Sequence, residues 1–369
     1  MRAATTRVTQ EDCRLTGIIA RLPRARTYWL IAISIILCAF MTNASAHRAT
    51  QRVAHEHATA VKKPSVHRKA AKHRRPHARH RATRPKHASA QPSRRTKRAS
   101  TVRPRNAPAK PRLLASCGYS SRAVKSLHSR AAYVLDVDTR TPLVARNART
   151  VRPIASISKL MTAVVARNAG RPLNGMLRVS AHDRDAIKFT GSRLAVGSTL
   201  SRRDMYHIAL MSSENRAAAA LSRDFPGGRP AFVAAMNREA KRLGMRHTRF
   251  REPTGLSPHN VSTAEELARL VDAAAQDPLI RRFSTDKSKT VRPGDDELIY
   301  VNSDPLVRSG RLPIRLQKTG FINESGYGVV MRMHVHGRPE TVVLLGAPTR
   351  AGVTSDALRI HRWLSCSLK

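Results

Sequence analysis

The run PIASISKLMT at residues 153–162 places a serine and a lysine three positions apart at the expected start of a helix. On a helix, Ser156 and Lys159 would share one face, one turn apart. A serine hydroxyl is a weak nucleophile that needs an adjacent base, and a buried lysine that loses its proton can serve as that base. Taken alone, the pair is better explained as a serine that caps the helix and a lysine in solvent.

Two further short motifs follow in chain order and change that interpretation. Ser213-Glu214-Asn215 falls at an expected junction between helices, and Lys318-Thr319-Gly320 falls on an expected strand. Motifs of the types S-x-x-K, S-x-N and K-T-G in this order are typical of serine acyl-transfer sites. Lys318 could favour the neutral form of Lys159, and Ser213 could relay a proton to the leaving amine. Backbone N–H groups at the helix start could face a developing oxyanion.

Signals of secondary structure place the three motifs in an α+β fold, with strands at both ends of the folded part and helices in the middle. This order predicts one antiparallel sheet flanked by helices, with a helical subdomain. A capping box of Ser262 and Glu265 would start one of the helices. The expected strands lie at residues 133–137, 143–145, 314–318, 328–335 and 341–345, and the expected helices at 156–168, 201–211, 215–223, 229–243, 262–277 and 354–364.

The chain of 369 residues has 68 Lys and Arg against 24 Asp and Glu, a formal net charge of +44. Residues 47–112 hold 21 basic residues and one acidic residue, with few large apolar side chains. Such a segment cannot bury enough apolar area to fold, so we expect a disordered tether. It could also bind an anionic wall polymer or lipid headgroups. A nucleic-acid arm is less expected, because the segment lacks aromatic residues for base stacking.

The N-terminus carries the pattern of an export signal. Arg21, Arg24 and Arg26 precede an apolar run at residues 28–41, and Ala44-Ser45-Ala46 follows. A basic region, a short apolar run and a small-x-small site predict a signal peptide cleaved after Ala46 and a periplasmic protein. The alternative is an uncleaved anchor, although a membrane span needs about 20 residues. The expected organisation is a signal peptide at residues 1–46, a polybasic linker at 47–112 and a catalytic domain at 113–369.

The runs around the motifs resemble the low-molecular-mass penicillin-binding proteins, the serine D-alanyl-D-alanine carboxypeptidase and endopeptidase family. The endopeptidase branch is the more similar one, and the resemblance covers roughly residues 130–365. This family implies a penicillin-recognising serine peptidase fold of the β-lactamase-like type. The matching runs are residues 153–162, 182–185, 210–217, 252–257 and 317–324.

The resemblance also implies a reaction and a role for each site residue. The reaction is hydrolysis of a D-alanyl peptide bond in peptidoglycan through an acyl-enzyme, without a metal or cofactor, with β-lactams as covalent inhibitors. The implied roles are nucleophile for Ser156, general base for Lys159, proton transfer and amide binding for Ser213 and Asn215, carboxylate binding for Lys318 and Thr319 beside Gly320, and an oxyanion hole from the N–H groups of Ser156 and Phe321.

Other functions remain open at this level. Only 49 residues follow Gly320, fewer than a second β-domain and membrane helix of many related carboxypeptidases would need. We therefore expect an endopeptidase, with carboxypeptidase as the alternative. A β-lactamase would need a glutamate to activate water, and Glu252 is the candidate, although an ion pair with Arg249 or Arg251 is the simpler expectation. A non-catalytic, polycationic wall-binding protein is the last alternative.

The remaining polar residues have simpler expected roles. Cys117 and Cys366 stay in the mature chain and, near the two ends of the folded part, could form a disulfide or remain free thiols. Asp183 and Asp185 suggest a turn held by ion pairs with Arg184 and Lys188, rather than a catalytic carboxylate pair. Trp363 is expected to pack against the sheet. Three histidines have no metal-ligand spacing: His182, His207 and His247.

Overall fold

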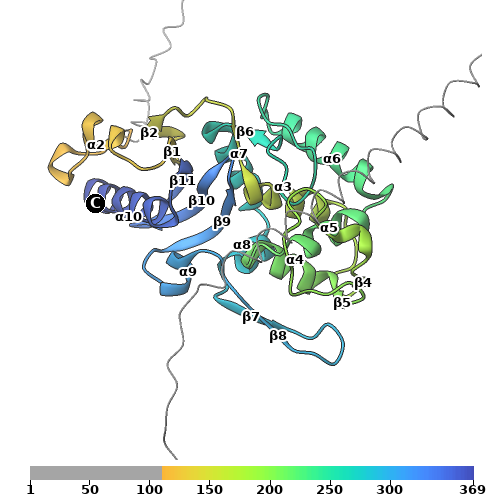
Figure 1. Cartoon of the computed structure of the whole chain (residues 1–369). Helices are drawn as coiled ribbons and strands as arrows, with labels where there is room; N and C mark the ends of the chain where they lie inside the picture. The colour runs from red at the N-terminus through yellow and green to blue at the C-terminus, as the bar shows by residue number, and fades with distance from the viewer. Residues whose placement is uncertain (1–109) are drawn as a thin grey trace, which may run out of the picture. The chain divides into compact units, whose positions relative to one another are not determined.

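The computed structural model describes residues 110–369, which form a five-stranded antiparallel sheet and a layer of helices (Figure 1). The strand order β2-β1-β11-β10-β9 joins the first hairpin to the last three strands. This confirms the predicted α+β fold. The signal peptide and the polybasic linker were predicted within residues 1–112, nearly all outside the described residues. The strands are β1 (Ala131–Asp136), β2 (Thr141–Arg146), β9 (Ile314–Ile322), β10 (Gly326–Val335) and β11 (Arg338–Ala347).

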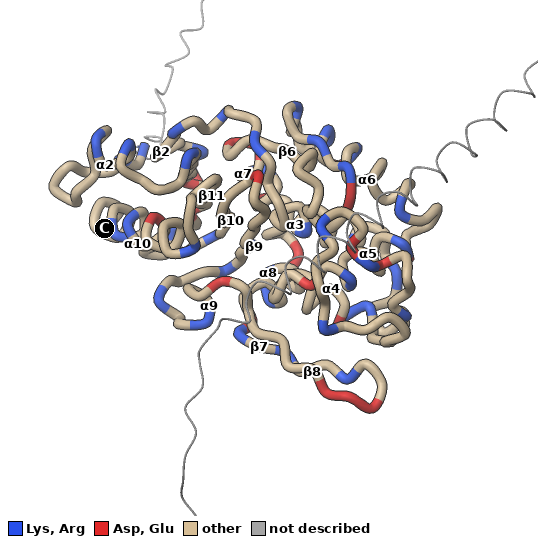
Figure 2. The backbone as a smooth tube through the Cα atoms, viewed as in Figure 1, with Lys and Arg blue, Asp and Glu red and all other residues tan. Residues whose placement is uncertain are grey.

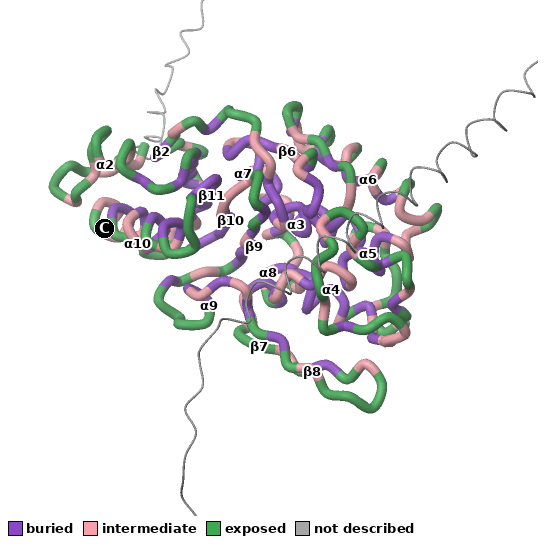
Figure 3. The backbone as a smooth tube through the Cα atoms, viewed as in Figure 1, coloured by how far each residue is buried: buried purple, intermediate pink, exposed green. Residues whose placement is uncertain are grey.

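The middle of the sheet is buried on both faces. Side chains alternate between the faces of a strand, so Val342 and Leu344 of β11 pack in one apolar cluster with Trp363 of α10 (Arg350–Ser367). Val343 and Leu345 point the other way, into a cluster that includes residues of the helical layer. The predicted packing of Trp363 is confirmed. Burial in Figure 3 follows the same division, with the central strands and the inner helices buried.

The helical layer surrounds α3 (Ser158–Asn168), which is buried along most of its length. Two helix ends in this layer have local causes: Ser201 caps α4 by accepting a hydrogen bond from the Asp204 N–H, and Gly170 follows α3 with a positive φ of 66°. The other helices of the layer are α4 (Arg202–Met211), α5 (Asn215–Arg223), α6 (Gly228–Arg242), α7 (Ala264–Ala274) and α8 (Pro278–Thr285).

The predicted capping box of α7 is wrong by one residue. Ser262 belongs to the two-residue strand β6 (Val261–Ser262), and Thr263 is the cap that accepts from the Glu266 N–H. The sequence signals also missed α8 and several short elements, because a strand of two to four residues carries too short a pattern to be recognised. These elements are η1 (Ala115–Cys117), α2 (Ser121–Lys125), β3 (Arg152–Pro153), η2 (Ala155–Ile157), β4 (Met176–Arg178), η3 (Ala181–Asp183), β5 (Thr199–Ser201), β7 (Ser288–Val291), β8 (Leu298–Val301) and α9 (Pro305–Ser309).

A disulfide between Cys117 and Cys366 confirms the predicted pairing. It links η1 to the last turn of α10, with 5.6 Å between the Cα atoms and 249 positions between them in sequence. Tyr119 packs edge-on against Trp363 beside it, with the ring centroids 5.6 Å apart. The bridge therefore holds the two ends of the described chain together. Within residues 110–369, no helix is long and apolar enough to cross a membrane.

Replacing both bridge cysteines with serine should destabilise the domain, because an open chain gains entropy in the unfolded state. The expected loss in the free energy of unfolding is about 2–4 kcal/mol, measured by denaturant unfolding. A reducing agent should cause the same loss in the native protein and none in the double variant. Equal stability of oxidised native protein and the double variant would contradict a stabilising role for the bridge.

Candidate active site

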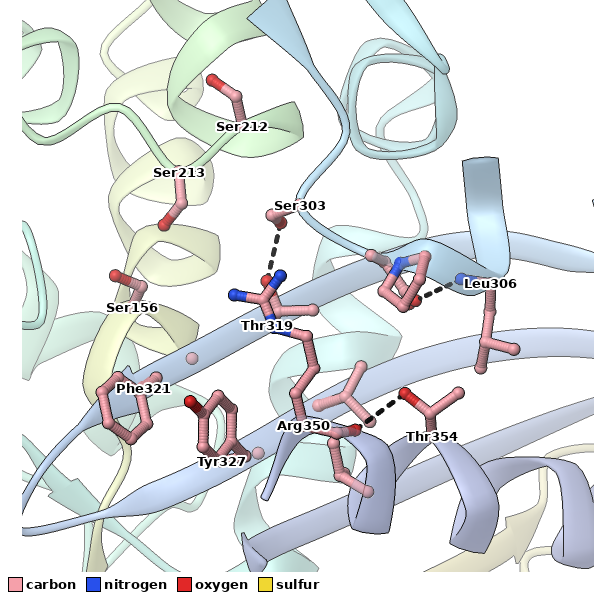
Figure 4. A pocket seen from close by; sticks show the side chains of 16 residues that line it. Ser156, Ser212, Ser213, Ser303, Leu306, Thr319, Phe321, Tyr327, Arg350 and Thr354 are labelled. Carbon is pink, nitrogen blue, oxygen red and sulfur yellow. Dashed lines mark hydrogen bonds between the residues drawn. The ribbon is translucent and has the colours of Figure 1, made fainter. Parts of the chain in front are cut away.

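Ser156 lies in the 3₁₀ turn η2, immediately before α3, and not in the first turn of the α-helix itself. The preceding residue, Ala155, has a φ of +48°, a left-handed conformation that an alanine rarely adopts. This backbone turns the serine side chain out of the helical layer and into a pocket of about 240 Å³. Figure 4 shows Ser156 on one wall of that pocket.

Lys159 is the central polar group of the site. Its side chain is 1% exposed, and Nζ lies 2.9 Å from Ser156 Oγ, 2.7 Å from Asn215 Oδ1 and 2.6 Å from the Thr254 carbonyl oxygen. Burial lowers the pKa of Lys159 to about 8, against the opposing charges of three nearby carboxylates. About one tenth of the amine is then neutral at pH 7. A neutral Lys159 is placed to take the proton of Ser156.

The S-x-N motif lies at the turn between α4 and α5. Ser213 has a φ of +67° and faces Ser156 across the pocket (Figure 4). Glu214, the middle residue of the motif, is buried and caps α5, and its carboxylate accepts hydrogen bonds from Ser192 Oγ and the Tyr300 hydroxyl. Glu214 therefore fixes the turn that carries Ser213. No sequence signal distinguished this residue, because Ser192 and Tyr300 lie far from it in the chain.

Lys318 is fully buried in β9, and its Nζ donates to the carbonyl oxygen of Thr319 at 2.9 Å. Burial holds the pKa of Lys318 well below its ordinary value, and the charge of Lys159 lowers it further, while Asp304 opposes both. Neither Lys318 nor Asn215 is among the residues that line the pocket, whereas Thr319 is. The hydroxyl of Thr319 lies 2.6 Å from that of Ser303.

Two glycines allow the backbone to pack around Ser156. A Cβ on Gly255 would lie 2.0 Å from the Ala155 carbonyl oxygen and 2.7 Å from the Ser156 nitrogen. A Cβ on Gly320 would lie 2.9 Å from the Ile154 carbonyl oxygen. The loop at residues 252–257 and strand β9 can therefore approach the backbone at residues 154–156 this closely only where side chains are absent.

Strand β9 is the edge of the sheet, so its outer backbone groups lack a strand partner. Gly320 and Phe321 of this strand line the pocket, and Phe321 stacks on Tyr327 of β10 with 4.2 Å between the ring centroids. The position of Phe321 is compatible with the oxyanion role implied for its N–H. The structure thus gathers the residues of all three motifs around Ser156.

Arg350 is a pocket residue that the sequence signals missed. It is the first residue of α10, and it lines the same pocket as Thr319, into which its side chain extends in Figure 4. A cation at a helix N-terminus works against the helix dipole. That disadvantage is the one signal that could have marked Arg350 as a functional residue.

The loop at residues 252–260 corrects one expectation. Glu252 does not pair with Arg249 or Arg251: its carboxylate accepts from the backbone N–H groups of Thr254 and Gly255 and from Asn260 Nδ2. The side chain is therefore occupied in holding the loop that presents the Thr254 carbonyl to Lys159. Sequence reasoning overlooked Thr254, since a backbone acceptor leaves no residue-type signal.

The carboxylates of Asp183 and Asp185 also differ from expectation. Asp183 does not pair with Arg184; its buried carboxylate binds Arg223 and Arg229 of α5 and α6. Asp185 accepts hydrogen bonds from backbone N–H groups of its own loop. The side chain of Lys188 instead pairs with Glu324 in the β9–β10 turn at 2.5 Å.

The described residues contain no group of three His, Cys, Asp or Glu side chains placed to hold a metal ion. His207 pairs with Asp286 and His247 with Glu266. What the site offers chemically is a serine hydroxyl in a pocket, with a buried amine within hydrogen-bond distance of it. The fold and this arrangement define a serine hydrolase of the acyl-enzyme type.

A family model described as D-alanyl-D-alanine carboxypeptidase, peptidase S11, matches residues 119–349. The chain belongs to this family. Curated D-alanyl-D-alanine endopeptidases are similar: one from Pseudomonas aeruginosa is 46% identical over 65% of this chain and 78% of its own length, and one from Escherichia coli K12 is 41% identical over 70% and 84%. A mutant of the Streptomyces K15 DD-transpeptidase has a similar fold, with a TM-score of 0.61 at 24% identity over 64% of this chain and 98% of that one.

The rate of Ser156 acylation should rise with pH and level off above about pH 8. Below the pKa of Lys159, each pH unit multiplies the neutral amine by about ten. The rate is measured as labelling by a fluorescent penicillin from pH 6 to 9.5, with thermal unfolding at each pH as the control for folding. A rate that stays flat from pH 6 to 9 would show that Lys159 is not the base.

Gly255→Ala should reduce acylation of Ser156 by about 10²-fold, because the new Cβ displaces the backbone beside the nucleophile. Gly337→Ala is the matched control: its φ of +82° is close to the +84° of Gly255, but nothing lies within 4 Å of the added atom. It should cost about 1 kcal/mol of stability and leave acylation unchanged. Equal acylation rates in the two variants would contradict the close-approach argument.

Proposed function

We propose that this chain is a serine-type D-alanyl-D-alanine endopeptidase that hydrolyses peptidoglycan cross-links through an acyl-enzyme on Ser156. The observation that carries the proposal is the buried Lys159 amine 2.9 Å from the Ser156 hydroxyl. We infer the endopeptidase specificity from the Pseudomonas aeruginosa and Escherichia coli relatives, which are both named D-alanyl-D-alanine endopeptidases. β-Lactams would acylate the same serine.

Acylation begins with the neutral form of Lys159, which accepts the proton of Ser156 as Oγ attacks the carbonyl carbon of the D-alanyl residue. The resulting oxyanion lies between the N–H groups of Ser156 and Phe321. The proton then passes through the hydroxyl of Ser213 to the leaving amine. The C–N bond breaks, the amine departs, and the D-alanyl group remains as an ester on Ser156.

Deacylation reverses the proton path. Lys159 takes a proton from a water molecule that attacks the ester carbonyl, and the proton returns to Ser156 Oγ as the carboxylic acid product leaves. Asn215 and the Thr254 carbonyl keep the amine of Lys159 oriented throughout, because they accept its remaining hydrogen bonds at 2.7 and 2.6 Å. The cycle needs no group beyond the chain and water.

Substrate orientation depends on the carboxylate next to the scissile amide. The Arg350 guanidinium and the Thr319 hydroxyl lie on the same side of the pocket (Figure 4), where they can bind that carboxylate. A planar guanidinium suits two-point binding of a carboxylate. Lys318 then acts through its charge on Lys159 and not by contact with the substrate, since it does not line the pocket.

The structure gives the β-lactamase alternative little support. Its water-activating glutamate would have to be Glu252, and that carboxylate already accepts hydrogen bonds from Thr254, Gly255 and Asn260. The carboxypeptidase alternative uses the same catalytic groups and differs only in the substrate. The non-catalytic alternative conflicts with a site in which each motif is intact and assembled.

We also propose that residues 113–369 are the catalytic domain of an exported, periplasmic enzyme. All of the proposed site residues lie in this range, and the disulfide between Cys117 and Cys366 suits an oxidising compartment. The signal peptide cleaved after Ala46 and the tether at residues 47–112, with its affinity for anionic wall or membrane surfaces, remain predictions of the sequence.

Cross-linked muropeptide dimers and pentapeptide monomers distinguish the candidate activities. The full chain should convert dimers to monomers faster than it releases D-alanine from pentapeptides, and Ser156→Ala should lower cleavage by 10⁴-fold or more, on the order of the loss seen in other serine hydrolases.

Three results would overturn the proposal in different ways. Dominant D-alanine release would identify a carboxypeptidase, and steady turnover of a chromogenic cephalosporin would identify a β-lactamase. Unchanged cleavage by Ser156→Ala would remove the catalytic assignment.

A further inference from the structure

A second hollow is lined by α6, by residues 244–251 that follow it, and by Val261. It has a volume of about 1210 Å³ and shares no lining residue with the pocket at Ser156. Four of its lining residues are exposed bases: Lys241 at the end of α6, and Arg246, Arg249 and Arg251 in the following segment. We call this hollow the basic groove.

The charges of the basic groove are unbalanced within the described residues. None of the four basic side chains forms an ion pair or a hydrogen bond within residues 110–369. His247, which also lines the groove, pairs with the carboxylate of Glu266. Elsewhere on the helical layer, Asp183 binds both Arg223 and Arg229. Figure 2 shows basic positions along α6 and the segment that follows it. Like charges around one hollow repel each other, and an anionic ligand would relieve that repulsion.

The groove is built on a rigid frame. The side chain of Asn237 on α6 accepts from the Phe250 N–H at 2.9 Å and donates to the Phe250 carbonyl at 2.8 Å. Asn260 accepts from the Arg251 N–H at 2.7 Å and donates to Ser158 Oγ in α3 at 3.0 Å. The end of the basic segment at Phe250 and Arg251 is therefore fixed both to α6 and, through Asn260, to the helix that carries Lys159.

One residue of the basic groove also lies close in the chain to a residue that contacts Lys159. Arg251 precedes Thr254 by three residues, and Thr254 is the residue whose carbonyl binds Lys159. Three residues span at most about 10 Å. A polymer with one bond at Ser156 can therefore place other parts of itself at the groove.

We propose that the basic groove binds carboxylate groups on the peptide stems of peptidoglycan, at a distance from the cross-link being cut. This inference rests on the proposed function, because it assigns a second contact to the same substrate. The groove wall at Pro230, Val233 and Ala234 gives the aliphatic parts of a stem an apolar surface. Base stacking is little supported, since Phe250 in the lining is 1% exposed and the exposed ring there, His247, is paired with Glu266.

The test compares two triple variants of the full chain. Lys241→Gln/Arg246→Gln/Arg249→Gln removes three charges from the groove. Arg122→Gln/Lys125→Gln/Arg362→Gln removes three exposed charges from α2 and α10, which lie across the structure from α6 in Figure 1. Both variants keep the polybasic N-terminal segment, so its contribution is the same in each. Labelling by a fluorescent penicillin reports whether the Ser156 site is folded.

The groove variant should bind isolated sacculi and cleave their cross-links about tenfold less well than the control variant at low salt. Its cleavage of a small muropeptide dimer and its penicillin labelling should match those of the control. Added salt should reduce the difference on sacculi, because exposed charges are screened within about 8 Å at physiological ionic strength. Sacculi with amidated carboxylates should bind the native and groove proteins equally.

Equal activity of the two variants on sacculi, with native protein active, would overturn the groove assignment and leave the proposed function intact. A groove variant that loses binding to a DNA duplex but keeps sacculus cleavage would overturn it in favour of nucleic acid. If native protein takes the penicillin label but cleaves neither sacculi nor dimers, the proposed function fails first.

Discussion

The buried ammonium of Lys159 is the constraint on which the rest of the site depends. A charged group taken out of water costs several kcal/mol unless hydrogen-bond acceptors surround it. Its acceptors come from three separate segments: Ser156 before α3, Asn215 at the start of α5, and the carbonyl of Thr254. The hydrogen bonds of the Lys159 side chain therefore form only when α3, α5 and the loop that contains Thr254 pack together. The same burial brings the pKa of Lys159 to about 8.

The backbone around the site is held in conformations that the fold must impose. Ala155 and Ser213 both have positive φ values although neither is glycine, and such residues cost of the order of 1–3 kcal/mol each. Gly255 and Gly320 let neighbouring backbone press on the turn that carries Ser156. Strain and close packing thus occur at the two serines that face each other across the pocket, where orientation matters most for proton transfer.

The parts of the fold predicted from sequence are those with local causes. The boundaries of α5, the start of α4 and the paired strands β1 and β2 follow from patterns within a few residues. The errors involve partners distant in the chain. Asp183 binds arginines about 40 residues away rather than its neighbour Arg184, and Glu252 serves backbone N–H groups. Local charge patterns cannot reveal such choices, because nearby arginines are abundant in this chain.

The sequence by itself predicted the class of fold, from the order of its strand and helix signals, and a serine acyl-transfer chemistry, from three short motifs in order. Only the tertiary structure decided which of those groups are buried, and hence how they behave. It buried Lys318 away from the pocket lining, brought Arg350 and Thr319 into one pocket, and set around one groove four bases that have no ion pair within residues 110–369. The physical reason is that burial and charge balance depend on contacts between distant segments, which residue types and their spacing do not specify.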